Sequence, residues 1–486
     1  MKAQNNLVTA PIASTLLLFA LPTLASSMLQ SANGSFAALW VGRLLGSGAL
    51  AATTNGNLVM FLMTAFVFGF GMASTILVGQ AYGRDDLESA RRVVGTAVGT
   101  FVPVAAVLAL GGWFLAPAVL ETLGTDPAIT PLARDFLRVT FLALPGILLM
   151  TMLMMALRGS GDSITPLIFM ALAVVLDILL NPVFILGLGP APRMGIGGSA
   201  FAMAIANYTA LAAMLVWIYA RDLPLRLRGA ELAWLRPDPA ILGLMLRKGL
   251  PMGVQMIVVS GSMLAMMRLV NAQGVDTTAA FGATQQIWTY VQMPAMALGA
   301  AVSAMAAQNI GAGLWDRVAQ ITRIGVIYNL MLTGALVVLL LAVDRHAMQV
   351  FLGDDSTAIS IGQRIALLGT WGFIPFGVTM VLFATIRANG QVVWPLLILC
   401  VSMFPVRLGF AYGMQGLLGT DAIWLSFSAA MLATMVMAVL LYRYGNWRAA
   451  DDMQITSPER QPMAAALYSE ACPPHCGRAA HAPAAR

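Results

Sequence analysis

Charged side chains are scarce in this sequence. Only 10% of the 486 residues are Asp, Glu, Lys or Arg, whereas 59% are hydrophobic. A soluble domain typically has about 25% charged and 45–50% apolar residues. The composition therefore excludes an ordinary soluble protein and favours a membrane protein with many spans, because each spanning helix needs about 20 mainly apolar residues.

Cysteine and histidine are also rare, with three residues of each. Three cysteines provide no disulfide framework, and Cys400 lies in an apolar segment, where we expect it to pack as a small hydrophobic residue. An intramembrane enzyme would need a nucleophile with a base, or clustered metal ligands, at membrane depth. The histidines lie in a loop, at His346, and in the C-terminal tail. We therefore expect no enzymatic activity, no cofactor and no metal site. The tail residues that are metal ligands by type lack the paired spacing of a zinc site; they are Cys472, His475, Cys476 and His481.

Twelve apolar segments are long enough to span a bilayer, which predicts an all-α membrane protein. They cover residues 8–34, 54–81, 90–118, 132–157, 164–188, 196–220, 241–270, 278–307, 318–343, 362–386, 392–415 and 422–442. The first is too long for a signal-peptide core and contains Pro11 and Pro22, so we treat it as a span. Residues 444–486 are rich in Ala, Pro and Arg, and we expect a disordered cytoplasmic tail there.

The distribution of basic residues predicts the orientation in the membrane. If the N-terminus is cytoplasmic, the inward loops carry more than twice as many Lys and Arg residues as the outward loops. The positive-inside rule therefore puts both termini in the cytoplasm. We expect the protein to lie in the inner (plasma) membrane. The net charge of +6 reflects this orientation, so we expect no nucleic-acid partner.

The two halves of the chain look like copies of each other. Matching prolines, glutamines and glycines recur at a separation that is constant to within one position; the pairs are Pro22 and Pro251, Gln80 and Gln308, Gly83 and Gly311, Gly161 and Gly390, and Pro166 and Pro395. Such a constant separation predicts two six-span lobes, in residues 1–220 and 249–443, joined by a cytoplasmic linker at 221–248. An even number of spans in each lobe predicts a pseudo-two-fold axis along the membrane normal.

The motifs around these glycines resemble the multidrug and toxic compound extrusion (MATE) family. They read ILVGQAYGRDDLESARRVVGTA, ALRGSGDSITP, LDILLNPVFILGLG and SAMAAQNIGAGLWDRVAQ, and the resemblance covers about residues 8–443. It implies a secondary transporter, an antiporter that exports organic, often cationic and amphipathic compounds in exchange for protons or sodium ions. The expected partners are small-molecule substrates and the lipid bilayer, and we expect a monomer. We expect Gly83, Gly161, Gly311 and Gly390 to end helices and turn the cytoplasmic loops.

Of the 21 acidic residues, only Asp177 lies near the middle of a predicted span. Acids at membrane depth are costly and usually functional. Asn181 follows at i+4 on the same helical face, and Pro182 frees the carbonyl of Ile178. These groups predict an ion-coupling site at Asp177 and Asn181, the alternative being a neutral Asp bonded to a neighbouring helix.

The sequence departs from the MATE pattern around this predicted site. Many members have Asn and then Asp before the proline, whereas this chain has Asp177 and then Asn181, and the acid that many members carry late in the first span is replaced by Ala37. The acids of the seventh and tenth spans in other branches are also missing. A single buried acid suits a proton better than a sodium ion, which prefers several oxygen ligands. We therefore favour coupling to H+, with Na+ as the alternative.

The second half offers neutral polar residues for a substrate cavity. Gln285, Trp288 and Gln292 share one face of the eighth span, with Tyr290 to one side. Polar residues also hold membrane helices together, so a cavity role and a packing role are equally expected here. Further candidates are Asn207, Gln255 and Asn57.

Two arginines leave the charge of the substrate open. Arg268 and Arg407 fall within the seventh and eleventh spans, and snorkelling toward the interface accounts for both. If they faced the cavity instead, anionic substrates would be favoured. The alternative function would then be a lipid-linked precursor flippase of related architecture.

Overall fold

The structure is a computed structural model and describes residues 7–122, 129–189, 192–352 and 356–449. The predicted tail from residue 450 onward, with its cysteines and histidines, lies outside the described residues. Within these ranges the chain is helical, without strands. The α-helices are α1 (Ile12–Leu45), α2 (Ser47–Gly83), α3 (Leu87–Thr122), α4 (Thr130–Gly159), α5 (Ile164–Leu186), α6 (Ile196–Ala220), α7 (Pro239–Asn271), α8 (Val275–Gly311), α9 (Trp315–Ala342), α10 (Asp344–Leu352), α11 (Ser356–Gly369), α12 (Phe373–Ala388), α13 (Val393–Val401), α14 (Arg407–Gly413), α15 (Gln415–Leu418) and α16 (Asp421–Tyr444).

Twelve helical segments of the described chain are long and apolar enough to cross a membrane, as the sequence predicts. The tenth, Thr357–Ala388, consists of α11 and α12 joined by the 3-10 turn η2 (Thr370–Gly372). The eleventh, Val393–Gly413, consists of α13 and α14 joined by the π-helical turn η3 (Ser402–Val406). The protein is therefore a multi-pass membrane protein.

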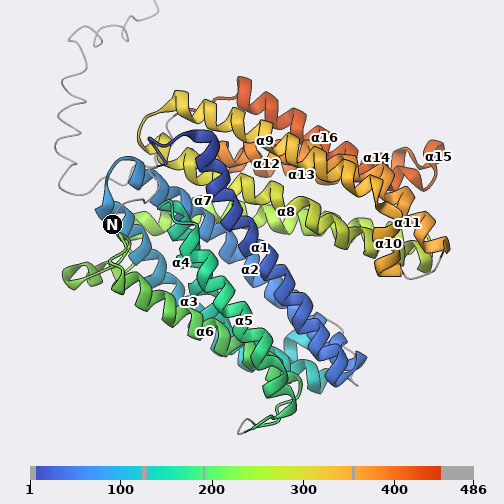
Figure 1. Cartoon of the computed structure of the whole chain (residues 1–486), viewed down its shortest axis with the longest axis horizontal. Coiled ribbons are helices and arrows are strands. Elements are labelled where there is room, and N and C mark those ends of the chain that lie inside the picture. Colours follow the sequence, from blue (N-terminus) through green and yellow to red (C-terminus); the bar gives the residue numbers. More distant parts are fainter. Residues whose placement is uncertain (1–6, 123–128, 190–191, 353–355, 450–486) are drawn as a thin grey trace, which may run out of the picture.

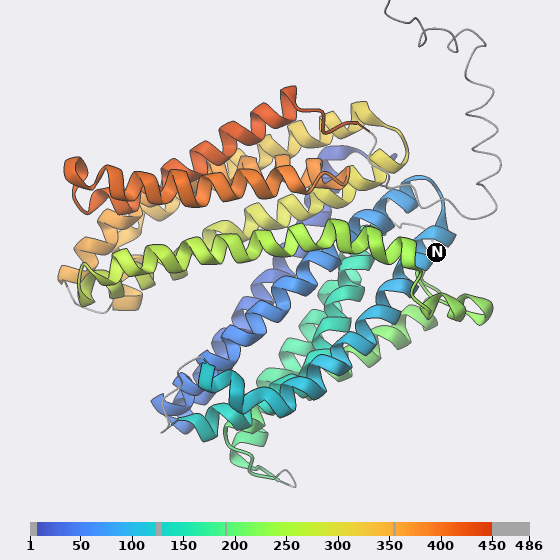
Figure 2. The same ribbon diagram turned by 180° about the vertical axis from the view of Figure 1, so that it is seen from behind.

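The helices form two bundles, and Figure 1 shows that these bundles meet at one end and diverge toward the other. Helices α1–α6 make the first lobe, and α7–α16 make the second. Figure 2, which gives the view from behind, shows the same angle between the lobes, with α7 along the near side of the second lobe. We call the end where the lobes meet the closed end; α2, α4, α8 and α12 finish there.

The two lobes exchange the first parts of their leading helices. Leu16 and Phe19 of α1 belong to a hydrophobic cluster with Leu298 of α8, in the second lobe. Reciprocally, Met245 and Met252 of α7 belong to the main hydrophobic core of the first lobe. Each lobe therefore holds one helix of the other by burial of apolar surface.

Helix α1 is longer than the sequence predicts. The prediction that the first span ends at residue 34 was wrong, because the helix continues through the polar stretch Asn33–Ser35 to Leu45. The Ser35 hydroxyl donates to the Ser31 carbonyl of its own helix, so this polar side chain does not interrupt the helix. Gly46, at φ +85°, then makes a one-residue turn into α2, a conformation that favours glycine.

The connection between the lobes is docked on the first lobe. It contains the 3-10 helix η1 (Gly229–Leu235), which lies against α3. Arg91 of α3 pairs with Glu231 at 2.5 Å, and Arg92 pairs with Asp238 at 2.7 Å. All four side chains of these ion pairs are only partly exposed, so the connection is a fixed part of the first lobe up to the start of α7.

Candidate functional site

Asp177 lies inside the first lobe, bonded to two asparagine side chains. Asp177 and Asn181 of α5 are only 3% and 1% exposed. The Asn181 amide donates to Asp177 Oδ1 at 3.0 Å, and the Asn33 amide of α1 donates to Asp177 Oδ2 at 2.8 Å. Both oxygens of the carboxyl group are therefore held by amide donors from two different helices.

The geometry of these helices explains the arrangement. Asp177 and Asn181 are four residues apart and so lie one turn apart on the same face, and the Asn181 amide also donates to the Asp177 carbonyl at 3.1 Å. The sequence did not predict that Asn33 belongs to this site. It lies one turn before Ala37, where many MATE members carry an acid, so the face of the first span that includes Ala37 was the signal that could have found it.

The oxygens of both amides are unused in this cluster. Asn33 Oδ1 and Asn181 Oδ1 are buried and have no hydrogen-bond partner within the described part of the chain. Together with the Asp177 carboxylate they offer four oxygen atoms in one small volume. Protonation would turn the carboxyl group into a donor, and these amide oxygens are the acceptors at hand.

The predicted polar face of α8 divides into a buried and an accessible part. Trp288 is 3% exposed; its indole donates to the Thr370 hydroxyl at 2.9 Å, and its ring stacks on Phe427. Trp288 therefore packs inside the second lobe, which corresponds to the packing role that the sequence left open beside a cavity role. Gln285 and Gln292 are partly exposed.

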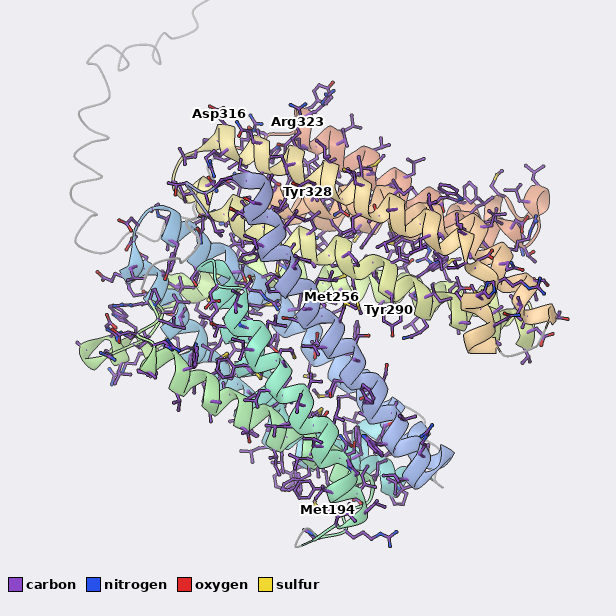
Figure 3. All side chains as sticks on the ribbon, in the orientation of Figure 1. Met194, Met256, Tyr290, Asp316, Arg323 and Tyr328 are labelled. Carbon is purple, nitrogen blue, oxygen red and sulfur yellow. The ribbon has the colours of Figure 1, made fainter. Side chains whose placement is uncertain are left out.

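Tyr290 is the most accessible of the α8 candidates, at 46% exposure. Figure 3 places it, with Met256 of α7, near the point where α1 and α8 diverge. The side of α8 that carries Tyr290 is thus not covered by other helices.

The three remaining cavity candidates lie in different surroundings. Gln255 is buried, where it donates to the Val392 carbonyl and accepts a hydrogen bond from Arg387, so it ties α7 to the tenth span. Asn207 donates to the carbonyl of Met203 in its own helix. Asn57 is exposed on α2. Gln255 and Asn207 thus have bonding partners that require no substrate.

The two intramembrane arginines also differ. Arg268 is exposed near the end of α7, which agrees with snorkelling. Arg407 is only 5% exposed, and its guanidinium lies over the ring of Phe427. Snorkelling was therefore the wrong interpretation for Arg407, because its charge is buried inside the second lobe.

Two of the four repeated glycines turn loops as predicted, and the other two end helices as predicted without making the turn. Gly161 and Gly390 have φ values of +97° and +80°, which favour glycine. Gly83 and Gly311 are instead the last residues of α2 and α8, without a positive φ. A Cβ atom on Gly83 would overlap the Gln308 carbonyl, so glycine is required there for the close approach of the two helices.

The contacts that hold the closed end recur at equivalent positions of the two sequence halves. Just as Gly83 touches the Gln308 backbone, Gly311 touches the Gln80 backbone. The Gln80 amide of α2 donates to the Ala388 carbonyl at 2.7 Å, and the Gln308 amide of α8 donates to the Gly159 carbonyl at 2.9 Å. Gly159 and Ala388 are separated in sequence by the same interval as Pro22 and Pro251, so the acceptors repeat as the glutamines do. These two amide bridges join the lobes symmetrically.

Comparison with known proteins agrees with the architecture and the repeat. The family profile described as MatE matches residues 22–183 and again residues 251–413, together more than half of the chain. A solved structure described as the outward-facing conformation of a multidrug resistance MATE family transporter has a TM-score of 0.83. That structure is 18% identical in sequence, and the match covers 92% of this chain and 98% of that chain.

Curated relatives match over nearly their whole length. The probable multidrug resistance protein YoeA of Bacillus subtilis is 34% identical over 429 residues, which cover 88% of this chain and 92% of that protein. The FAD transporter of Shewanella oneidensis is 25% identical over 86% of this chain and 93% of that protein. The buried acid, the two-lobed fold and the repeated match lead to one assignment: the chain belongs to the MatE family of multi-pass membrane transporters and is not an enzyme.

Proposed function

We propose that this protein is a secondary active efflux transporter of the inner (plasma) membrane, which exports organic, amphipathic, drug-like compounds in exchange for protons. The observation that carries the proposal is the buried Asp177 carboxyl group, held between α1 and α5 by the amides of Asn33 and Asn181. A coupling ion acts only through a group whose occupancy favours one conformation over another. Asp177 meets that requirement, because its protonation changes the bonds between two helices.

Helix α1 connects this group to the other lobe. Its Asn33 bonds Asp177 in the first lobe, whereas the residues before its start are held by the second lobe. The Asn309 amide donates to the Leu7 carbonyl at 3.1 Å, and the Arg317 guanidinium donates to the Ala10 carbonyl at 2.8 Å. A change at Asp177 therefore acts on a helix that is attached to both lobes.

The closed end supports transport by alternating access. The positive-inside rule assigns this end to the cytoplasm, together with both termini. The lobes are then open toward the outside, and the amide bridges of Gln80 and Gln308 close the cytoplasmic side. In the inward-open state both bridges have to break, and the freed groups become hydrated.

Protons are favoured over sodium ions by the bonding of the acid. Each Asp177 oxygen already accepts one amide N–H group, which points a positive dipole at the carboxylate and leaves fewer lone pairs for Na+. A proton adds only one donor, for which the unpaired amide oxygens are suitable acceptors. The alternative of a lipid-linked precursor flippase receives less support, because relatives that cover most of the chain are named as multidrug resistance proteins.

The decisive experiment uses purified protein in sealed vesicles. Wild-type protein should move ethidium in response to a pH gradient, and it should do so without sodium. Asp177→Asn keeps the size and removes the charge, so it should abolish drug-driven proton movement while the thermal unfolding temperature stays within a few degrees. The matched control is Glu121→Gln, an exposed acid near the end of α3, and its coupling should be unchanged.

Two results would overturn the proposal. Intact coupling in Asp177→Asn would remove this residue from its role. A strict requirement for a sodium gradient, with no transport in a proton gradient alone, would reject protons as the coupling ion.

A further inference from the structure

The ion-coupling pair of the first lobe has a counterpart in the second lobe. Asn33 of α1 corresponds to Ser262 of α7 at the same separation as Pro22 and Pro251, and Asp177 of α5 corresponds to Arg407 at a separation one position longer. The extra residue lies in the π-helical turn η3, just before Arg407. A π turn closes its hydrogen bonds over one residue more than an α turn and so shifts the register by one.

The contact between the two helices is also repeated. Asn33 bonds Asp177 across α1 and α5, and Arg407 Nη1 donates to Ser262 Oγ across α14 and α7, at 3.4 Å. The Ser262 hydroxyl in turn donates to the Met403 carbonyl of the π-helical turn at 2.9 Å. The second lobe therefore repeats the contact between the corresponding helices but carries the opposite charge.

Arg407 is poorly compensated in this position. Its Nε is buried without a hydrogen-bond partner in the described part of the chain, and its only other charge-stabilising contact there is with the Phe427 ring, 5.5 Å from the guanidinium carbon. On α16, the acidic residue nearest to Arg407 in sequence is Asp421, and it pairs with Arg364 at 2.5 Å instead. A buried charge without a partner costs several kcal/mol, and arginine does not lose its proton to avoid this cost.

We infer that Ser262 and Arg407 form a binding site for the anionic group, a carboxylate or a phosphate, of a transported organic compound. Guanidinium donors match such groups in geometry and charge. The guanidinium lies over the ring of Phe427, on which Trp288 stacks, so the immediate surroundings of the site are aromatic. This inference rests on the proposed function and adds compounds with an anionic group to its substrates. Ethidium transport tests the proposed function, and phenyl phosphate binding tests this site.

The two opposite charges have a consequence for the energetics of transport. If one proton enters on Asp177 as one monovalent organic anion leaves, two positive charges move inward per cycle. An inside-negative membrane potential then drives export even without a pH gradient. Export of a monovalent cation against one proton would move no net charge and would not respond to the potential alone.

Binding is tested first, in purified protein without any gradient, so that a failure of coupling cannot mask it. The probe is phenyl phosphate, with benzyl alcohol as the neutral aromatic compound, phenyltrimethylammonium as the cation and inorganic phosphate as the small anion. We expect phenyl phosphate to raise the thermal unfolding temperature and the other three to have little effect. Arg407→Gln should weaken phenyl phosphate binding at least ten-fold, equivalent to about 1.4 kcal/mol.

Controls separate binding from folding. Arg268→Gln removes an exposed arginine of the same lobe and should leave the affinity unchanged. If Arg407→Gln does not fold, Arg407→Lys keeps the charge but not the planar fork and should weaken binding by a smaller factor. An equal response to phenyl phosphate in wild type and both Arg407 variants would overturn the inference, as would no response in wild type. An equal effect of inorganic phosphate would show a small-ion site and reject the organic substrate. In vesicles, export of phenyl phosphate has to respond to an imposed potential; no response would reject the exchange with one proton.

Discussion

The amide bridges at the closed end give a quantitative prediction for the conformational equilibrium. In Gln80→Ala the bridge to the Ala388 carbonyl is lost, and in Gln308→Ala the bridge to the Gly159 carbonyl is lost. Both glutamines are buried, so in the closed state no water replaces the missing donor. In the open state the same carbonyls are hydrated, and the substitution has little effect. Each variant therefore shifts the equilibrium toward the inward-open state.

The size of the shift in the conformational equilibrium follows from the free energy that one hydrogen bond contributes. A typical intramolecular hydrogen bond contributes about 1 kcal/mol, which is a factor of about 5 in an equilibrium constant. The two bridges share no hydrogen-bond partner, but the segments of α2 and α8 that carry them are in contact, so additive effects serve as the reference from which coupling is measured. The double variant should favour the inward-open state by about 2 kcal/mol, or about 30-fold.

The assay measures the accessibility of one cysteine at the closed end. Ser160 is buried next to Gly159, and Ser160→Cys changes only one atom. In a background without the three native cysteines, a membrane-impermeant maleimide is added from the cytoplasmic side. If opening is fast relative to labelling, the labelling rate is proportional to the open population. We expect rates about 5-fold above the reference in each single variant and about 30-fold in the double variant.

The control variant is Gln285→Ala, which removes a glutamine of α8 that lies away from the closed end and contacts Met263 in the same lobe. Its labelling rate should equal that of the reference. If the double variant and this control were labelled at the same rate, the amide bridges would contribute nothing to closure and the reasoning would be refuted.

Three further predictions concern other parts of the chain. Gly311→Ala adds a methyl group that overlaps the Gln80 carbonyl, so it should speed labelling of Ser160→Cys and lower the free energy of unfolding by about 1–3 kcal/mol. The control, Gly334→Ala, adds a methyl group in open space and should do neither. Equal effects of the two substitutions would contradict the close approach at Gly311. Asn33→Ala leaves the Asp177 carboxylate with one donor fewer, so the pH dependence of ethidium exchange should differ from that of wild type. An unchanged pH dependence would argue against the contact. Deleting residues 450–486 should leave transport intact, and a loss of activity would show that the tail has a role.

The sequence predicted most of the architecture, because the membrane imposes a simple rule on it. Each span needs a long apolar run, and the chain has so few charged residues that such runs are easy to delimit. The repeat was visible because glycine and proline are retained where the backbone requires them. Glycine turns at Gly161 and Gly390 have positive φ values, which other residues rarely adopt.

The errors come from residues whose role depends on a neighbouring helix. Asn33, with Gly34 and Ser35, looked like the polar end of a span, whereas these residues continue α1. The amide of Asn33 faces Asp177 from another helix, far away in the sequence, which no local pattern reveals. The role of Trp288 stayed open between a cavity and packing for a similar reason, since its position on a polar face does not reveal that Phe427 of α16 covers its ring.

The relation between Asp177 and Arg407 extends this point to the repeat itself. A search for matching residue types finds glycines and prolines, because the two lobes share backbone geometry, but an acid and an arginine do not match by type. The π-helical turn also shifts the register by one residue, so the separation of Pro22 and Pro251, applied unchanged, pairs Asp177 with the apolar Val406. Only the contacts with Asn33 and Ser262 identify the two charged residues as equivalent. If the inference at Arg407 holds, a duplicated fold acquired two functions by changing charge at one equivalent position, with the proton on one lobe and the substrate anion on the other.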